Sequence, residues 1–316
     1  MRSTVCTLFE NHYHEGVVAL TNSLYNQGYR GDIYAGYRGE LPDWTKKAER
    51  NTAIGWDGAV SLTISSDLSI HFLPIHTEYH LSNFKPNFML RLWEILPENI
   101  EAMAYFDPDI VNKCPWSFYE TWMDNGVALV HEITSNDMPP THPLRLEWEK
   151  VLEKCGRKSI RRTHSYINAG FCGVARKHIE FLKLWLEIMD TAIKHYNVTP
   201  DQWDHSLPRS FVFYVFDQDA LNIAAMACSS PISEMGPEAM DFTPGGWTMS
   251  HAVGSPKPWK KKFILSALKG VPPSLTDRAF WFNVESPLNY YNASMVRRKR
   301  LSVNVAALIG RFYSRR

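Results

Sequence analysis

The chain has 316 residues, 45% of them hydrophobic and 21% charged, which fits one large α/β domain or two smaller ones with a substantial core. The formal net charge of +1 gives no reason to expect a nucleic-acid partner. The five scattered cysteines include no CxxC pair, so neither a zinc site nor a disulfide framework is indicated, and a reduced, cytosolic setting is expected. Neither a secretory signal peptide nor an apolar run of membrane-spanning length is recognisable.

The predicted elements alternate between strands and helices along most of the chain. Short apolar runs predict strands at 3–9, 31–39, 68–75, 101–111, 127–133 and 166–176. Apolar residues at helical spacing predict helices at 16–28, 86–99, 144–155, 177–195 and from about 217 to 227. The strand-helix-strand order at the start predicts a parallel sheet. No GxGxxG or GxxxxGK[ST] motif is present, so the usual dinucleotide fingerprint and the P-loop are both excluded.

Two aspartates, Asp107 and Asp109, end the predicted strand in AYFDPDIV (104–111). Ligands of open α/β sheets bind at the carboxyl ends of strands, so these carboxylates lie where chemistry is expected. Residues two apart on a straight strand also share one face. The alternative is that the pair caps a turn before Pro115 and has no catalytic role.

Four segments in a fixed order carry a more specific pattern. They are LTNSLYNQGYRGDIYAGYRG (20–39), FDPDIV (106–111), YINAGF (166–171) followed by FDQDALN (216–222), and HAVGSPKPW (251–259). Together they resemble GT-A glycosyltransferases, in particular the retaining enzymes of family 8 that use nucleotide-diphosphate sugars. That family's His-x-x-Gly-x-x-Lys-Pro-Trp loop is matched by His251, Gly254, Lys257, Pro258 and Trp259. One departure is the segment TLFENHYHEG (7–16), which replaces the family's usual aspartate-containing stretch after the first strand.

The resemblance implies an α/β, Rossmann-like GT-A domain over 1–284, with a mixed, mainly parallel sheet flanked by helices. Its nucleotide-sugar-binding half is expected over about 1–112, and its acceptor half with a closing loop over 113–284.

The expected cofactor is a divalent cation. A glycosyl transfer from a diphosphate leaves negative charge on the leaving group, which a metal ion neutralises as a Lewis acid. The expected ligands are Asp107, Asp109 and His251, with Asp107 alternatively on the sugar or ribose. Carboxylate oxygens suit Mg²⁺ or Mn²⁺, and the imidazole favours Mn²⁺.

The nucleotide and its diphosphate are expected to meet a second group of residues. Lys257 is interpreted as a phosphate anchor, and Gly254 lets the backbone approach closely; the alternative is a solvated lysine, since three more lysines follow. Thr7, Phe9 and Tyr37 lie at the ends of the first two strands, where an aromatic ring can stack on the base, although ordinary packing explains them equally well. Lys85 is a further candidate for the diphosphate or ribose.

The sugar is expected to contact the NAGF and FDQDALN segments. The resemblance implies substrate contacts from Asn168, Ala169, Gly170, Asp217 and Gln218. Asp217 and Gln218 are also the expected catalytic residues: Gln218 would lie near the anomeric carbon, where its carbonyl stabilises positive charge, and Asp217 would hold sugar hydroxyls. Asp219 opens a helix, where a carboxylate complements the helix dipole.

The C-terminal segment 285–316 differs from the rest of the chain. From residue 289 onward it has seven basic residues and no acidic one, which leaves a net charge of −6 on the remainder. Its apolar residues at helical spacing are Leu301, Val305, Leu308, Ile309 and Phe312. A basic amphipathic helix over 297–316 predicts contact with an anionic membrane surface. The alternatives are a helix docked on the body, a disordered tail and, least favoured, nucleic-acid binding.

The sequence therefore predicts a metal-dependent transferase that moves a hexose, galactose or glucose, from a UDP-sugar to a saccharide acceptor with retention. The expected setting is bacterial cell-surface polysaccharide or lipopolysaccharide synthesis, with a lipid-linked acceptor and a peripheral position on the inner face of the cytoplasmic membrane. The alternatives are an inverting transferase, a nucleotidyltransferase, and a catalytically silent GT-A module that binds glycan or scaffolds an assembly. The nucleotidyltransferase is disfavoured because ENHYHEG (10–16) is not a Gly-rich, basic phosphate loop.

Overall fold

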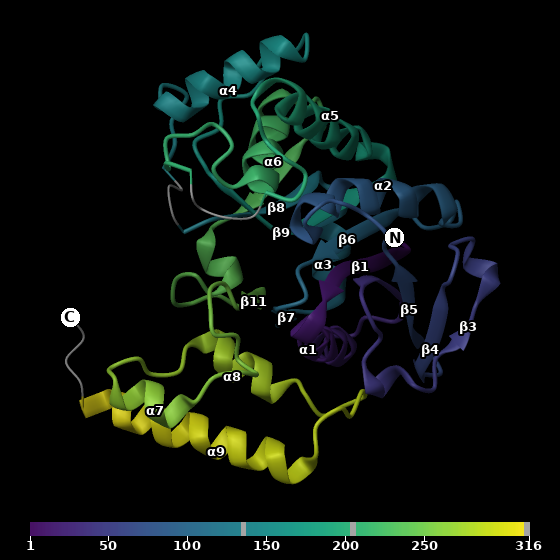
Figure 1. Ribbon diagram of the computed structural model, residues 1–316, viewed down its shortest axis with the longest axis vertical. Coiled ribbons are helices and arrows are strands. Elements are labelled where there is room, and N and C mark those ends of the chain that lie inside the picture. The colour runs from purple at the N-terminus through teal and green to yellow at the C-terminus, as the bar shows by residue number, and fades with distance from the viewer. Residues whose placement is uncertain (134–136, 203–206, 313–316) are drawn as a thin grey trace.

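The computed structural model describes residues 1–133, 137–202 and 207–312. Within these ranges, a nine-stranded sheet with the order β10-β8-β9-β6-β1-β2-β5-β4-β3 forms the centre of the molecule, and β7 and β11 form a separate ribbon (Figure 1). The strands are β1 Ser3–Glu10, β2 Gly31–Arg38, β3 Glu49–Arg50, β4 Val60–Ser65, β5 Leu68–Pro74, β6 Ala102–Phe106, β7 Ile110–Asn112, β8 Val127–His131, β9 Ile167–Ala175, β10 Ile232–Met235 and β11 Met249–His251. The helices are α1 His14–Asn26, α2 Lys85–Ile95, α3 Trp116–Asp124, α4 Pro143–Lys154, α5 Glu180–His195, α6 Phe216–Ala227, α7 Phe263–Leu268, α8 Leu275–Phe282 and α9 Ala293–Ile309.

The four central strands, β6, β1, β2 and β5, are parallel, which confirms the predicted α/β architecture. The helix α1 makes the crossover between the parallel neighbours β1 and β2, and α2 carries the chain from β5 across β1 and β2 to β6. Antiparallel strands complete both sides: β4 pairs with β5, and β9 lies between β6 and β8. The strand β4 was not predicted. It lies near the edge of the sheet and is only partly buried, so it lacks the continuous apolar run of the central strands.

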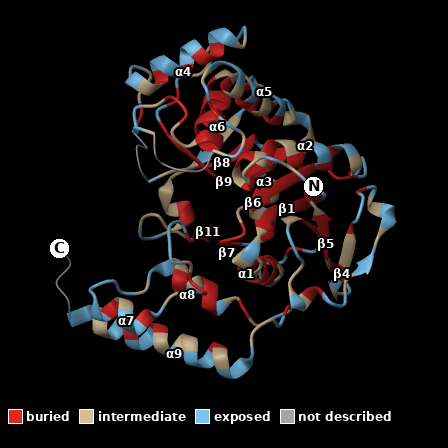
Figure 2. Cartoon of the chain, viewed as in Figure 1, coloured by how far each residue is buried: buried red, intermediate tan, exposed pale blue. Residues whose placement is uncertain are grey.

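The alternation of side chains along β1 divides the core into two layers. Cys6 and Leu8 pack in one layer with the side chains of α2, α4, α5 and α6. Val5 and Phe9 point to the other face, where α1 and α3 cover the sheet. Figure 2 shows buried residues concentrated in the central strands and in the helices against them.

The chain turns sharply at the carboxyl end of β6. It passes through residues 107–109 and enters β7, which pairs antiparallel with β11 and sets His251 opposite Ile110. The helix α1 approaches this turn closely because residue 16 is glycine: a Cβ there would lie 2.2 Å from the carbonyl oxygen of Pro108. The sequence FDPDIV is therefore held between α1 and a strand that arrives about 140 residues later in the chain.

The helix α9 docks on α7 and α8 to form a third cluster below the sheet (Figure 1). Val296, Val303 and Ala306 are buried in this cluster, and Arg300 Nε donates to the carbonyl oxygen of Trp281 at 2.9 Å. The described part of the predicted tail is thus a docked helix that keeps one face free. The last four residues, 313–316, which include the predicted tail's Tyr313, Arg315 and Arg316, lie outside the described residues. In the described ranges no helix has the length and apolar character needed to cross a bilayer.

Candidate active site

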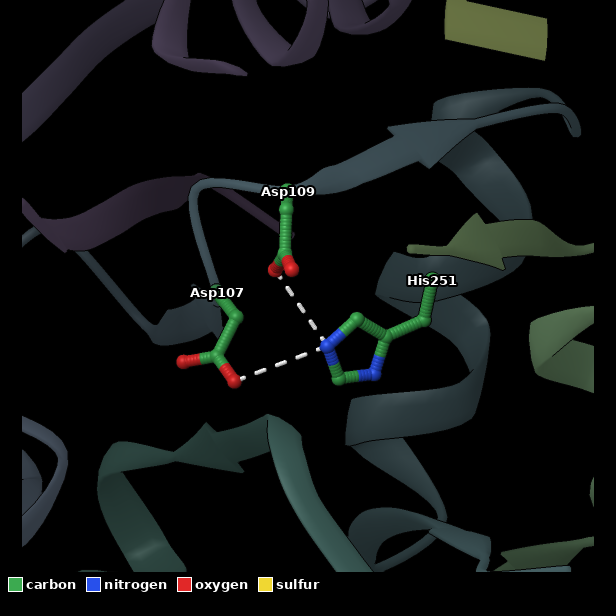
Figure 3. Close-up of side chains that lie close together, drawn as sticks. All are labelled: Asp107, Asp109 and His251. Carbon is green, nitrogen blue, oxygen red and sulfur yellow. Dashed lines mark ion pairs between the residues drawn. The ribbon is translucent and has the colours of Figure 1, made fainter. Parts of the chain in front are cut away.

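Asp107, Asp109 and His251 meet at the carboxyl end of β6. His251 Nε2 lies 3.3 Å from Asp109 Oδ1 and 3.7 Å from Asp107 Oδ2 (Figure 3). One ligand atom from each residue lies within 4.8 Å of the other two, so the three can share one ion. Two carboxylate oxygens and one imidazole nitrogen form a donor set that suits Mn²⁺, and the site fits the expected cofactor. His251 Nδ1 is buried and has no hydrogen-bond partner among the described residues.

Gly170 in the NAGF segment makes room for the imidazole. A Cβ at this position would lie 2.4 Å from His251 Cε1, and the carbonyl oxygen of Gly170 accepts a hydrogen bond from Asp107 N at 2.7 Å. Gly170 was expected, from the family resemblance, to contact the substrate. In the structure the space beside Gly170 holds a metal-ligand candidate, so this glycine supports the metal site.

Lys257 contacts the same carboxylate. Its Nζ lies 2.6 Å from Asp109 Oδ2 and donates to the carbonyl oxygen of Ala252 at 2.8 Å. Burial of Asp109 favours its neutral form, but the contacts of this carboxylate with His251 and Lys257 outweigh burial and hold its pKa well below the usual range. Asp109 is therefore a carboxylate at neutral pH. Gly254, with φ of +77°, makes the turn in the loop that carries Lys257 to this position.

Lys85 connects the metal-ligand candidates to α6. It is buried, and its Nζ lies 2.8 Å from Asp217 Oδ2, 3.0 Å from the carbonyl oxygen of Ala169 and 3.4 Å from Asp107 Oδ1. Burial opposes its charge, but Asp107 and Asp217 outweigh burial and raise the pKa of Lys85 above its ordinary value. Tyr105 OH donates to Asp107 Oδ1 at 2.8 Å. That Lys85 contacts the diphosphate or ribose stays a prediction; in the structure its ammonium group contacts Asp107 and Asp217.

The predicted sugar-binding residues are joined by hydrogen bonds. Gln218 Oε1 accepts from Ala169 N at 3.0 Å. Asn168 Oδ1 accepts from Gly170 N at 2.8 Å, while its Nδ2 donates to Glu132 Oε2 at 2.6 Å. The side chains of Asn168 and Gln218 are therefore fixed before any ligand arrives.

These residues line one cavity of about 540 Å³. The predicted site residues in its lining are Phe9, Asp107, Asp109, Asn168, Ala169, Gly170, Asp217, Gln218, His251, Gly254 and Lys257. The polar and aromatic lining residues that were not among the main candidates are Glu10, Tyr13, His80, Ser82, Lys85, Tyr105 and Glu132. Glu10 ends β1 and Glu132 follows β8, so the rule that identified Asp107 and Asp109 applies to these glutamates as well.

Three residues singled out in the sequence lie away from this lining. Thr7 is fully buried within β1, because its side chain points into the core. Tyr37 stacks on Phe9, with ring centroids 6.1 Å apart, and reaches the cavity only through that ring. Asp219 accepts hydrogen bonds from Tyr166 OH at 2.8 Å and from Val215 N at 2.7 Å, so its side chain caps the start of α6. Burial raises the pKa of this carboxyl to about 8.

Solved structures of glycosyltransferases match this chain over nearly its whole length, whereas no protein-family model and no curated protein matches it. The galactosyltransferase LgtC, in complex with donor and acceptor sugar analogues, is 15% identical with a TM-score of 0.53; the match covers 94% of this chain and 99% of LgtC. The glycosyltransferase GlyE of Streptococcus pneumoniae TIGR4 is 12% identical with a TM-score of 0.50, over 96% of this chain and 64% of GlyE. The bifunctional glycosyltransferase WbbM is 14% identical with a TM-score of 0.49, and this chain spans 52% of its length.

At these identities the likeness establishes the fold. The chain has the fold of the LgtC and GlyE glycosyltransferases, which confirms the GT-A fold expected from the four sequence segments. The fold and the cavity together define a GT-A scaffold in which Asp107, Asp109 and His251 lie close enough to share one metal ion.

Proposed function

We propose that the protein is a metal-dependent glycosyltransferase that moves a hexose, galactose or glucose, from a UDP-sugar to a saccharide acceptor. The observation that carries the proposal is the meeting of Asp107, Asp109, His251 and Lys257 in one cavity at the carboxyl ends of parallel strands. The similarity in fold to glycosyltransferases supports the same reaction class. A bound divalent ion would supply Lewis-acid neutralisation of the diphosphate that leaves.

In this proposal the diphosphate lies between the metal ligands and the loop of Lys257. Lys257 is held against Asp109 in the structure, so the ammonium group is already beside the place where the phosphate charge would develop. A lysine in this position supplies positive charge to a phosphate oxygen without a fixed bidentate geometry. Gly254 leaves the backbone of the same loop without a side chain next to the ligand.

The sugar is proposed to lie over Asn168, Asp217 and Gln218. The hydrogen bonds within this group orient the side chains before the donor binds, which lowers the entropy cost of reaching the reactive geometry. Asp217 is held by Lys85 and is proposed to accept hydrogen bonds from sugar hydroxyls. Gln218 is the proposed neighbour of the anomeric carbon.

Retention is proposed to occur by the front-face route, in which no carboxylate attacks the sugar. The cavity carboxylates with a hydrogen-bonding or ionic partner are Glu10, Asp107, Asp109, Glu132 and Asp217. Each partner withdraws electron density from its carboxylate and makes it a weaker nucleophile, so these contacts favour a route without an attacking carboxylate. They equally disfavour the general base that an inverting enzyme needs.

The proposed acceptor is a growing bacterial surface glycan on a lipid carrier or lipid core, in polysaccharide or lipopolysaccharide synthesis. The proposed position is the inner face of the cytoplasmic membrane, reached through the basic segment 297–316. Exposed apolar side chains on α9 support that contact. The intact metal-ligand set and the cavity argue against a module that binds glycan without catalysing transfer.

The proposal is tested by titration calorimetry with UDP in the presence and absence of Mn²⁺. We expect Mn²⁺-dependent binding that Asp109→Asn weakens strongly, because this change removes the charge of a metal ligand and keeps its shape. Metal-dependent hydrolysis in a screen of UDP-, GDP- and dTDP-sugars then identifies the donor. Absence of UDP binding with and without the metal would overturn the proposal, and UDP binding without any sugar hydrolysis or transfer would favour the silent module.

A further inference from the structure

The short helix α7 exposes an apolar face that belongs to no part of the active site. Ile264, Leu265 and Leu268 lie on one side of the helix and are between 41% and 55% exposed. Phe263 and Ala267 occupy the opposite side and are buried against α9. The face continues through Val271, which is also exposed. A cluster of large aliphatic side chains exposed on a protein surface marks a contact site.

The neighbouring helix α9 shows the same division. Its buried face packs on α7 and α8, and its exposed apolar residues are Leu301, Val305, Leu308 and, just beyond it, Phe312. The spacing of four, three and four residues places them in one stripe. The helices α7 and α9 lie side by side at the edge of the molecule, far from α4 (Figure 1).

A cavity of about 680 Å³ opens between the two helices. Its lining residues are Lys261, Lys262, Phe263, Ile264, Leu265, Leu268, Met295, Arg298, Lys299 and Ser302. Among the described residues, this lining combines apolar side chains with basic ones and includes no carboxylate. Lys261 is neutralised by Asp277 at 2.8 Å. Neither Lys262 nor Arg298 forms an ion pair within the part of the chain that the structure describes, and both are exposed.

We propose that α7 and α9 form a two-helix face for an anionic bilayer, and that the cavity between them binds one anionic phospholipid. An acyl chain lies along Ile264, Leu265 and Leu268, and the headgroup phosphate meets Lys262 and Arg298. An apolar cavity with the exposed cations Lys262 and Arg298 at its rim complements an amphiphile that carries an anionic head. The inference rests on the membrane contact proposed above and extends it from the C-terminal segment to α7 and a defined lipid site.

The test is sedimentation of the full chain with vesicles of phosphatidylcholine, with and without phosphatidylglycerol. We expect binding only when phosphatidylglycerol is present, and loss of binding at high salt. Lys262→Gln with Arg298→Gln should weaken binding about 30-fold, since each basic residue near an anionic surface contributes about fivefold. Leu265→Glu with Leu268→Glu should weaken it about tenfold or more, because both side chains are removed from the apolar phase.

Matched controls lie at the opposite end of the molecule, within α4 and just after it. Leu146→Glu places the same substitution on a similarly exposed leucine, and Lys158→Gln removes an exposed cation; both should bind vesicles as the natural chain does. Circular dichroism checks that each variant remains folded.

The outcomes separate this inference from the broader membrane proposal. If Leu308→Glu with Phe312→Glu abolishes binding while the α7 variants bind normally, the C-terminal segment alone attaches and the lipid site is refuted. If no vesicle is bound and the chain instead self-associates through this face, both membrane proposals fail. Either result leaves the transferase proposal intact, because UDP binding is measured without lipid.

Discussion

Lys85 and Asp217 form an ion pair across the candidate active site, with Nζ and Oδ2 2.8 Å apart and both side chains at most 4% exposed. The two residues are 132 positions apart in the sequence. The same ammonium group lies 3.4 Å from Asp107 Oδ1. The ammonium group of Lys85, at the start of α2, therefore contacts both the turn that carries the metal-ligand candidates and the start of α6. It also neutralises the carboxylate of Asp217, which is proposed to hold the sugar.

Replacing Lys85 with methionine should destabilise the protein strongly. The change leaves the carboxylate of Asp217 buried without its partner, and breaking a buried pair in this way costs about 3–5 kcal/mol. Urea denaturation measures the loss in the free energy of unfolding. Lys47→Met removes an exposed lysine and should change stability by less than about 0.5 kcal/mol. A Lys85→Met variant as stable as this control would show that the pair is dispensable.

Gly170→Ala should weaken metal binding while the fold is kept. The new methyl group would lie 2.4 Å from His251 Cε1, so the imidazole must leave its place beside Asp109. We expect the affinity for Mn²⁺ to fall about tenfold or more, as for changes that disturb the orientation of a metal ligand. Calorimetric titration of Mn²⁺ into the purified protein measures this directly.

The control for this variant is Gly156→Ala. Gly156 has φ of +66°, and no described neighbour lies within 4 Å of an added Cβ, so alanine there imposes backbone strain far from the metal ligands. It should lower stability by about 1 kcal/mol and leave the affinity for Mn²⁺ unchanged. Equal Mn²⁺ affinity in both variants would mean that His251 is not a ligand.

Much of the fold was predictable because its elements follow local rules. The strand-helix-strand start and the apolar run of β6 identified the parallel centre, and the strand-end rule placed Asp107 and Asp109 correctly at its carboxyl edge. The loop that begins at His251 was recognised from its motif. The apolar run 211–216 has the composition of a strand, but residues 211–215 form turns and bends and Phe216 begins α6. Periodicity alone cannot distinguish a short buried strand from other short buried segments.

The contacts that complete the site were not predictable, because they join residues far apart in the chain. Nothing in the sequence indicates that Gly170 lies against His251 or that Lys85 reaches Asp217. Thr7 and Phe9 are two residues apart on β1 and so lie on the same face of the strand. Side-chain alternation therefore cannot tell that Thr7 points into the core and Phe9 lines the cavity. Only the three-dimensional packing decides which strand-end residues face the ligand.

Lys257→Met should separate metal binding from nucleotide binding. Removing the ammonium group 2.6 Å from Asp109 removes a competitor for that carboxylate, so the affinity for Mn²⁺ without nucleotide should rise. The affinity for UDP should fall about tenfold to a hundredfold, the usual range for one charged hydrogen bond. The control is Lys260→Met, an exposed lysine of the same loop. Unchanged UDP affinity in Lys257→Met would refute the role of phosphate anchor.

Asp219 should make stability fall as the pH rises. Its pKa of about 8 in the folded state lies above the ordinary value of 3.8, so the folded protein keeps a proton that the unfolded chain releases. Between about pH 4 and pH 8 this favours unfolding by at most about 1.4 kcal/mol for each pH unit. Asp219→Asn mimics the protonated carboxyl and should flatten this dependence.

The measurement is urea denaturation at a series of pH values for the natural chain and Asp219→Asn. The variant should gain stability relative to the natural chain as the pH increases, and the gain should level off above pH 8. A constant difference across the series would mean that Asp219 is ionised in the folded protein, and that its hydrogen bonds from Tyr166 and Val215 hold a carboxylate.

Ending the chain after Asn292 should destabilise the remaining protein. The truncation removes Val296, Val303 and Ala306 from the cluster around Trp281 and leaves that ring exposed. Burial of two valine side chains alone corresponds to about 3 kcal/mol or more, so the melting temperature should fall measurably. If α9 did not pack on the domain, this truncation would leave the melting temperature unchanged.

Ending the chain after Gly310 provides the control for that deletion. Phe312 is 83% exposed and contributes nothing to the buried cluster, so this shorter deletion should melt like the full chain. This shorter deletion also removes part of the basic segment. It can therefore weaken membrane attachment without lowering the melting temperature, whereas the longer deletion should lower both. If both deletions melt at the temperature of the full chain, α9 does not stabilise the domain, and its contacts with α7 and α8 are too weak to hold the two-helix face together.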